Sequence, residues 1–333
     1  MDMEDYIIRF ADYRDIPSIM RFIDSDWKKG HILAHDRELF EWQYVDRKKV
    51  NMVLGLNTKG EIQAVLGFIT YGTDDNKDYC TSVWRAREGN SFLGIKLLLF
   101  LLKEEPHRVM FSNGINVKTS GGIYKRLGIH IGKLKQWYRL QQHKDYRIAN
   151  IETREIPKIK LENKFDLYLV SSFDEFVACV SPELFTRERI PFKGKEYINN
   201  RYFNHPSYKY EIYAVFDENQ IAHSAIVFRL QRYNDTCVLR IVDFLGRLND
   251  FYYLTQSIED LAKFYNAEYI DIYEYGLDDS MLYDSGWLLV GSNENIIPNY
   301  FAPYVQSNIE INICMTDENI VLFKGDGDQD RPN

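Results

Sequence analysis

The sequence has few cysteines, and their spacing gives no paired thiolate motif. Cys80, Cys179, Cys237 and Cys314 are the only four in 333 residues, and no two of them form a Cys-x-x-Cys pair. Such isolated cysteines are typical of reduced, buried thiols in a cytosolic protein. We therefore expect a cytoplasmic protein without a metal site.

A long apolar run is also missing. The longest one extends from Phe92 to Leu102 and is interrupted by Lys96, whereas a helix needs about 20 apolar residues to span a bilayer. The first five residues, Met-Asp-Met-Glu-Asp, are acidic and lack the apolar core of a signal peptide. We expect no membrane partner.

Excess positive charge is absent as well. The 41 Lys and Arg residues are outnumbered by 49 Asp and Glu residues, so the net charge is −8. Nonspecific nucleic-acid binding needs Lys and Arg to neutralise phosphates, so this balance argues against a nucleic-acid partner and suits a substrate that carries an amine. The hydrophobic fraction of 45% supplies a sizeable core, and the length suggests about two domains.

The most informative stretch runs from residue 79 to residue 102. Residues 79–86 alternate and are rich in β-formers, which predicts a strand. Residues 92–102 have apolar side chains at helical spacing, and the loop between contains Gly, Asn and Ser. A strand, a small-residue loop and a helix can hold an anion, because free N–H groups and the helix dipole meet at the helix start. A pyrophosphate would fit there.

A second strand, residues 108–113, is followed by Asn116 and by a Tyr-x-x-x-Gly-hydrophobic pattern that begins at Tyr124. This order of elements resembles the GNAT superfamily of acyl-CoA N-acyltransferases. The family's loop motif is Arg/Gln-x-x-Gly-x-Gly/Ala, followed by x-x-Leu-Leu, and residues 94–98 match its end. Gly89 and Phe92 stand where the motif has Arg/Gln and its first Gly.

The resemblance implies acetyl-CoA as the co-substrate. In GNAT folds the two central strands splay apart, and the backbone of the first strand hydrogen-bonds the pantetheine; here that implies Val83, Trp84 and Arg85. The loop and helix start would hold the pyrophosphate, which implies Glu88, Gly89, Asn90, Ser91, Phe92, Leu93 and Gly94. Tyr124 would protonate the leaving thiolate or would only pack under Gly128. Asn116 would contact the cofactor or would cap the short helix.

The acceptor side is expected in the segment 27–45, which mixes aromatic and charged residues. The resemblance implies that this segment helps to form the acceptor pocket, with Trp42 as a contact. His35 is the candidate general base, because the unperturbed pKa of histidine suits the role. His31, Glu41 and a chain of water molecules remain alternatives.

The pattern returns at an offset of about 158–160 residues, which indicates a tandem duplication. Gly286 corresponds to Gly128, but Leu282 stands in the place of Tyr124, and acidic residues at 250, 259 and 260 disfavour a phosphate. We predict an α+β fold of two tandem GNAT-like domains, each a mixed, mostly antiparallel sheet flanked by helices. Residues 1–149 would hold the acyl-CoA site, 150–162 a linker, and 163–333 a degenerate copy.

The second copy suggests an acceptor cleft formed jointly by both halves. Asp271 and Tyr273 alternate with apolar residues and so share one face of a strand; they line the cleft or face solvent. Residues 324–333 alternate Asp with Gly but lack the downstream Glu of a calcium loop. This segment is either solvated or folds back to the cleft, where its acids bind a cationic amine.

We expect an acetyl-CoA-dependent N-acetyltransferase in which a small amine attacks the thioester directly. The resemblance to tandem bacterial GNAT proteins implies a (nucleotide-linked) amino sugar of surface-polysaccharide synthesis as acceptor. One alternative is a Fem-like aminoacyltransferase, which the acidic balance disfavours. Another is a non-catalytic acyl-CoA-binding or scaffold protein. The sequence leaves both a monomer and a homodimer open.

Overall fold

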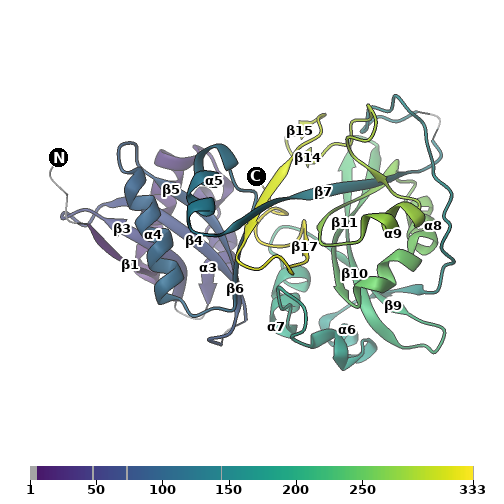
Figure 1. Cartoon of the computed structure of the whole chain (residues 1–333), viewed down its shortest axis with the longest axis horizontal. Helices are drawn as coiled ribbons and strands as arrows, with labels where there is room; N and C mark the ends of the chain where they lie inside the picture. Colours follow the sequence, from purple (N-terminus) through teal and green to yellow (C-terminus); the bar gives the residue numbers. More distant parts are fainter. Residues whose placement is uncertain (1–5, 47–48, 73, 144, 333) are drawn as a thin grey trace.

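The computed structural model describes residues 6–46, 49–72, 74–143 and 145–332. The molecule is elongated, with the elements of the first half at one end and those of the second half at the other (Figure 1). Strand β7 runs along the long axis from one half into the other (Figure 1). Within the described ranges, no helix is both long enough and apolar enough to cross a membrane.

The first half consists of short helices and a sheet, in this order: β1 (Ile7–Asp12), η1 (Tyr13–Asp15), α1 (Ile16–Phe22), η2 (Ile23–Trp27), α2 (Ile32–His35), α3 (Arg37–Tyr44), β2 (Val45–Asp46), β3 (Lys49–Leu56), β4 (Ile62–Tyr71), β5 (Asp78–Ala86), α4 (Ser91–Glu104), β6 (Val109–Asn113), α5 (Val117–Arg126) and β7 (His130–Leu140). The sequence predicts most of these elements. Helices α2 and α3 lie in the segment that it leaves unassigned.

The second half repeats this order and adds short strands near its end: β8 (Asp166–Val170), α6 (Phe173–Cys179), η3 (Pro182–Phe185), α7 (Lys195–Ile198), η4 (Asn199–Phe203), β9 (Glu211–Phe216), β10 (Ala222–Tyr233), β11 (Thr236–Gly246), η5 (Leu248–Tyr253), α8 (Thr255–Phe264), β12 (Tyr269–Tyr275), α9 (Asp279–Asp284), β13 (Leu288–Leu289), β14 (Tyr300–Phe301), β15 (Tyr304–Val305), β16 (Ile311–Met315) and β17 (Leu322–Phe323).

Local sequence explains several of these boundaries. Asp12 caps η1 in a capping box with Asp15, and Pro17 stands in the first turn of α1. The turn between β3 and β4 contains Gly60 at φ +79°, a conformation that favours glycine. The short helix α5 begins at an N-cap asparagine, Asn116, whose side chain accepts a hydrogen bond from the Lys118 N–H.

The strands of both halves join one continuous sheet. Its order is β1-β3-β4-β5-β6-β16-β7-β12-β11-β10-β9-β8. Among the described strands, β5 pairs with β6 and β11 with β12 in parallel, and the other ladders are antiparallel. Each half is therefore a mixed, mostly antiparallel sheet flanked by helices, which confirms the predicted fold class.

The two halves exchange strands at the centre of this sheet. Strand β7 pairs with β16 over residues 130–134 and with β12 over residues 135–140. Strand β16, from the end of the second half, lies between β6 and β7. The domain boundaries at residues 149 and 163 stay a prediction, because the sheet in each half includes a strand from the other part of the chain.

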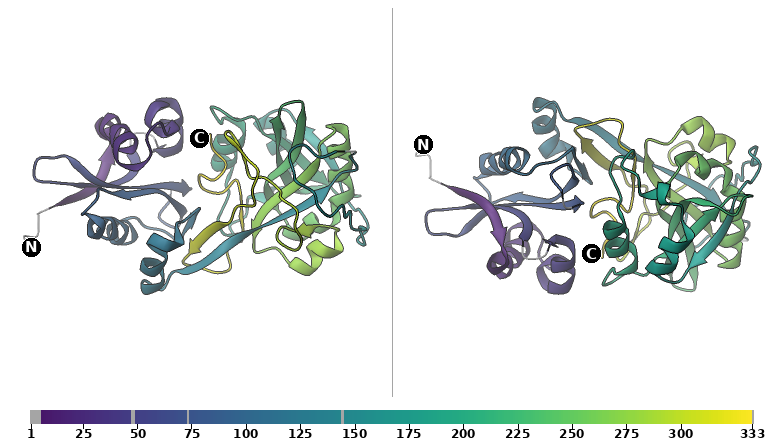
Figure 2. Two further views of the ribbon diagram at one scale, coloured as in Figure 1. Left: turned by 90° about the horizontal axis from the view of Figure 1, so that it is seen from above. Right: turned by 90° about the horizontal axis from the view of Figure 1, so that it is seen from below.

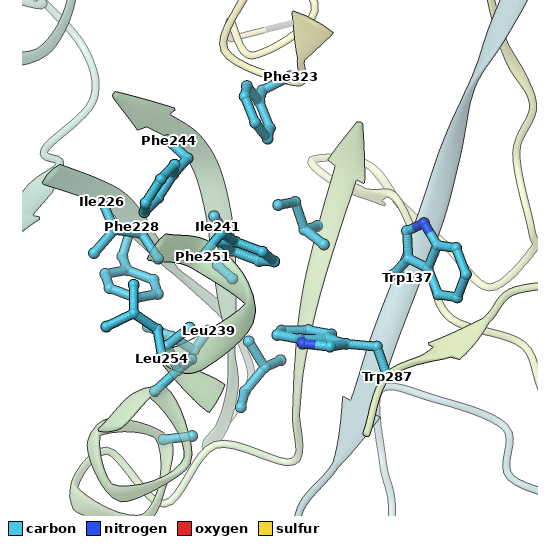
Figure 3. Close-up of a cluster of buried hydrophobic side chains, with 14 of the residues drawn as sticks. Trp137, Ile226, Phe228, Leu239, Ile241, Phe244, Phe251, Leu254, Trp287 and Phe323 are labelled. Atoms are coloured by element: carbon cyan, nitrogen blue, oxygen red, sulfur yellow. The ribbon is translucent and has the colours of Figure 1, made fainter. Parts of the chain in front are cut away.

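Separate hydrophobic clusters cover the two faces of each half. In the first half, α1, α2 and α3 pack on one face around Phe40 and Met52, and α4 and α5 pack on the other around Leu97 and Tyr124. In the second half, η5, α8 and α9 pack against β10, β11 and β12 in the cluster of Figure 3. The three views agree that helices lie on both sides of the sheet (Figures 1 and 2).

Candidate active site

The two parallel strands at the centre of the first half separate part of the way along. Strand β5 pairs with β6 from Asp78–Val109 as far as Thr81–Ser112, and β5 then continues to Ala86 without this partner. We call the region beyond this last pair the β5–β6 gap. The hydroxyl oxygen of Thr81 is buried and has no hydrogen-bond partner among the described residues. Backbone groups of residues 82–86 on the side of the gap can therefore accept an added strand.

The loop after β5 turns tightly into α4. Gly89 has φ +85°, and nothing lies within 4 Å of the position where a Cβ would stand. The Asn90 side chain does not cap the helix; its Oδ1 accepts from the Tyr6 hydroxyl, and its Nδ2 donates to Gln63. The N–H groups of the first helical residues lack intrahelical partners. An anion can therefore bind there without displacing a side-chain cap.

The first turn of α4 is partly fixed and partly exposed. Leu93 and Gly94 are buried, and the Trp84 indole N–H donates to the Gly94 carbonyl oxygen at 3.0 Å. Ser91 and Phe92 are exposed. Two of the predicted loop residues, Leu93 and Gly94, thus hold the helix on the sheet, whereas Ser91 and Phe92 present their surface to solvent.

Tyr124 on α5 lies at the start of the gap. Its ring packs at 5.7 Å from that of Trp84 and belongs to the cluster under α4. Burial raises the pKa of the phenol, and the side chains of Thr81 and Cys314 also act on this pKa. The hydroxyl is therefore protonated at neutral pH. The side chain both packs in the core and brings a proton donor to the last paired residue of β5.

Asn116 has the structural role that the sequence left open. It caps α5 through its Oδ1 atom, so the N-cap interpretation is confirmed and a contact to the cofactor stays a prediction. Asn113, at the end of β6, is the asparagine that lies close to the gap. Its side chain donates to the carbonyl oxygen of Asp326, and its own carbonyl accepts from Gln329.

A cavity of about 540 Å³ lies between the halves, on the α3 side of the first sheet. Its lining comes from α3, β2, β3 and β4, from residues 187–201 of the second half, and from Gly327. Trp42 lines this cavity, and its contact with the acceptor stays a prediction. The neighbouring Tyr44 donates to or accepts from the Ser82 hydroxyl at 2.9 Å. Helix α3 thus connects the cavity with the first unpaired residue of β5.

Several polar groups of this cavity have no partner in the described part of the chain. The Nε2 atom of Gln43 and the hydroxyl of Tyr197 are buried without a hydrogen bond. Asp46 also lines the cavity, and no hydrogen bond or ion pair of the described residues involves its carboxylate. Buried polar atoms without partners are rare in folded proteins, so this cavity suits a polar ligand.

The predicted general base, His35, does not lie at the cavity. His35 is exposed on α2 and pairs with Asp24 at 3.0 Å, and it does not line the cavity. Glu41 binds Arg37 and Tyr13 on the surface. His31 is buried against Arg331, and burial lowers its pKa to about 3, so it is neutral but enclosed.

The predicted contacts from β12 are wrong as well. Asp271 and Tyr273 are fully buried, and neither lines the cavity nor faces solvent. Asp271 forms an ion pair with Arg240 at 2.6 Å and also accepts from Gln136. The alternation along the strand placed both residues on one face, but that face is covered by the loop 297–301 and by β7, both of which are distant in the sequence.

The corresponding gap in the second half is filled by the chain itself. Strands β11 and β12 pair over Leu239–Ile270 to Ile241–Ile272 and then separate. Residues 322–325 enter there: the Gly325 N–H donates to the Val242 carbonyl and the Lys324 N–H to that of Tyr273. The ring of Phe323 points into the apolar cluster beside Phe244 (Figure 3). Residues 322–325 thus occupy backbone groups that an added pantetheine would use.

The acidic segment near the C-terminus is buried rather than solvated. Asp326 and Asp330 are fully buried, and Asp328 is 7% exposed. Asp326 binds Lys193 at 2.9 Å and accepts from the Tyr71 hydroxyl, so it ties both halves together. The segment does fold back between the halves, but most of its carboxylates meet cations of the chain itself.

The first half has two parallel strands that diverge, a helix that starts beyond them and a tyrosine where they separate. The second half repeats this arrangement without the tyrosine. Together the two halves have a tandem GNAT fold. Comparison with solved structures agrees. A GCN5-related N-acetyltransferase from Anabaena variabilis has a TM-score of 0.58 at 11% identity, over 93% of this chain and 72% of its own. A conserved protein of unknown function from Enterococcus faecalis also has a TM-score of 0.58, at 8% identity, over 92% and 72%.

A third similar structure is a GCN5-related glucosamine N-acetyltransferase region of a fungal multi-domain β-N-acetylglucosaminidase. Its TM-score is 0.52 at 9% identity, over 94% of this chain and 38% of that protein. No protein-family model matches the sequence, and no curated protein matches it. At such low identities the similarity establishes the fold, and the activity has to be argued from the site.

Proposed function

We propose that this protein is an acyl-CoA-dependent N-acyltransferase that acetylates a small amine. The observation that carries the proposal is the placement of Tyr124. Its protonated hydroxyl lies beside Thr81, the last residue of β5 that is paired with β6. A proton donor at the start of an open strand edge is what a departing thiolate needs, and packing alone would not require the hydroxyl.

The acyl-CoA would bind along the gap. Its pantetheine would run beside Val83, Trp84 and Arg85 as an added strand, and its pyrophosphate would meet the free N–H groups at the start of α4. Two arginines of the loop region are already engaged: Arg85 donates to the Asp26 carbonyl, and Arg87 pairs with the Asp26 carboxylate. Recognition of the pyrophosphate would therefore depend on the backbone and on the helix dipole.

The reaction requires two proton transfers: the sulfur of the leaving group gains a proton, and the attacking nitrogen loses one. The amine nitrogen attacks the thioester carbonyl, so that a C–N bond forms while the C–S bond breaks and its electron pair goes to sulfur. Tyr124 gives its proton to this sulfur. The proton lost by the nitrogen returns to the phenolate through water, which leaves the free thiol of CoA and the amide.

The acceptor would occupy the 540 Å³ cavity, which both halves line. Asp46 would receive its ammonium group, because this carboxylate is unpaired among the described residues, and this group would lose one proton to water before the neutral amine attacks. The amide of Gln43 and the hydroxyl of Tyr197 would bind hydroxyl groups, and Trp42 would contact the acceptor from the same lining. An amino sugar combines these features, and the similar fungal region is named for glucosamine acetylation.

The test is a thiol-release assay with acetyl-CoA and a panel of amines that contains glucosamine, its phosphates and nucleotide-linked amino sugars. We expect release above the rate of hydrolysis with at least one amino sugar. We also expect Asp46→Asn to raise KM for that amine more than it lowers kcat. Binding of acetyl-CoA without turnover of any amine would support the non-catalytic alternative instead.

A further inference from the structure

A second cavity lies in the second half and is lined mainly by polar side chains. Its volume is about 270 Å³, far more than the roughly 30 Å³ that one water molecule occupies. The basic residues in its lining are Arg229, Arg232, Lys324 and Arg331, and the acidic ones are Asp328 and Asp330. The lining is thus positively charged in a chain whose net charge is −8.

The cations around this cavity differ in what neutralises them. Arg229 pairs with Asp330, and its guanidinium also lies over the Tyr208 ring. Arg331 pairs with Asp328 at 3.2 Å. Lys324, in contrast, has no carboxylate within 4 Å in the part of the chain that the structure describes. Its ammonium donates to Asn299 Oδ1 at 2.7 Å and lies over the Tyr273 ring.

Burial makes this exception significant. The Lys324 side chain is only 3% exposed, and a buried charge without a carboxylate in direct contact is costly. Asp330 and Asp271 favour its charged form only from beyond 4 Å. Arg240 beside it gives no relief, because it adds positive charge and its partner Asp271 is already engaged. Burial and the neighbouring arginines lower the pKa of Lys324 to about 7, so the site holds its proton weakly until a negative charge arrives.

A second group at the same place also lacks a partner. Asn299 is 3% exposed and lines the cavity, and its Nδ2 atom has no hydrogen-bond acceptor among the described residues. Its Oδ1 atom is fixed by Lys324 and Arg240, so the amide cannot turn around without losing both bonds. Two groups at this cavity are therefore incompletely paired among the described residues: the Lys324 ammonium has no carboxylate within 4 Å, and the Asn299 Nδ2 atom has no acceptor.

We propose that this cavity is a binding site for a small oxyanion, a carboxylate or a phosphate group, held by Lys324 Nζ and Asn299 Nδ2. Arg232, which is exposed in the lining and has no carboxylate partner among the described residues, would attract the anion at the mouth. None of the residues that line this cavity belongs to β5, β6 or α4, and the proposal does not depend on acyl transfer. It would recognise a free metabolite anion or an acidic arm of a larger ligand.

The experiment is calorimetric titration of the whole protein with inorganic phosphate and, separately, with malonate, in a chloride buffer at pH 7. A Ser91→Glu background removes the competing anion site at the start of α4. We expect saturable binding of at least one of the two anions. We expect at least tenfold weaker binding in Lys324→Met and in Asn299→Asp, and unchanged binding in Lys133→Met, which removes an exposed lysine paired with Glu310.

Weaker anion binding by these variants should not result from a loss of stability. Lys324→Met removes an unpaired buried charge, and Asn299→Asp supplies the missing carboxylate at nearly constant volume, so both variants should be at least as stable as the parent. Phosphate binding without malonate binding would identify a phosphate site, and the reverse a carboxylate site. The proposal is overturned if neither anion binds at tens of millimolar, or if the two variants bind as well as Lys133→Met does.

Discussion

Removing the hydroxyl of Tyr124 tests the proposed chemistry most directly. The ring is buried against Trp84 and the cluster under α4, so Tyr124→Phe keeps the packing and deletes only the proton donor. Acid–base assistance typically contributes about 10²–10⁴ in rate, which corresponds to roughly 3–5 kcal/mol of transition-state stabilisation. We expect kcat to fall by that factor and the dissociation constant of acetyl-CoA to stay within about twofold, because the donor acts when charge develops on sulfur.

The chain contains a matched control for this substitution. Tyr79 lies on the same strand edge as Thr81, and its hydroxyl is also buried, but that hydroxyl has no hydrogen-bond partner among the described residues. Tyr79→Phe should therefore leave kcat unchanged and should not lower stability. The assay is single-turnover thiol release at saturating acetyl-CoA. Equal single-turnover rates for Tyr124→Phe and Tyr79→Phe would refute the acid role and leave Tyr124 a packing residue.

Four further predictions concern the cofactor, the ion pairs and pH. Ser91→Glu should raise the dissociation constant of acetyl-CoA about tenfold or more by calorimetry, whereas Ser91→Gln should not, since an acid at a helix start is favourable for folding but repels a pyrophosphate. The same titration should give one acetyl-CoA per chain, because residues 322–325 fill the second gap. Asp271→Asn should lower the free energy of unfolding by about 3–5 kcal/mol in urea, since it leaves the buried Arg240 unpaired; no loss would contradict that assignment. Below pH 6.5 the unfolded chain protonates His31 and the folded chain, with a pKa of about 3, does not, so stability should fall as pH decreases towards 3 and His31→Asn, which keeps a helix cap, should reduce that slope.

Local sequence patterns predicted the elements of the first half well. The alternation in residues 79–86 and the helical spacing in 92–102 correspond to β5 and α4, and the strand expected at 108–113 corresponds to β6. These signals are local, because each element presents one apolar face to a core. The strand exchange could not be predicted in this way. Residues 311–315 form a short apolar run that could pair with any edge, and the order of strands in a sheet depends on contacts distant in sequence.

The site was predicted unevenly for the same reason. Tyr124 and the loop 88–94 belong to one continuous supersecondary unit, so a motif located them. Gln43 and Asp46 lie close together in α3 and β2, but Tyr197 belongs to α7 of the second half. No pattern in the sequence indicates that these residues meet at one cavity. His35 followed from residue type alone, and residue type does not tell on which side of a four-residue helix a side chain lies. The acidic segment was ambiguous because its cations, such as Lys193, are more than 100 residues away.

The second gap is filled by the chain itself, and under the proposed function this would give the two similar halves different roles. In the first half, the backbone of β5 beyond Thr81 is open to an added strand. In the second half the equivalent position, the Val242 carbonyl, accepts a hydrogen bond from Gly325 of the same chain. A Cβ at Gly325 would stand 2.7 Å from the Tyr202 hydroxyl, so only glycine permits this approach.

The segment that fills the second gap then continues to the first half. Asp326 joins Lys193 to Tyr71, and Gly327 turns with φ +65° and lines the 540 Å³ cavity. The segment that fills the second gap therefore also forms part of the wall of the 540 Å³ cavity. Under the proposed function, this cavity would bind the acceptor next to an acyl-CoA in the β5–β6 gap. Once this segment is bound, a proton donor at the second gap would have no thiolate to protonate, and the buried Leu282 in place of a tyrosine agrees with that. Under the proposed function, the duplication would supply one half with a site and use the other half to shape it.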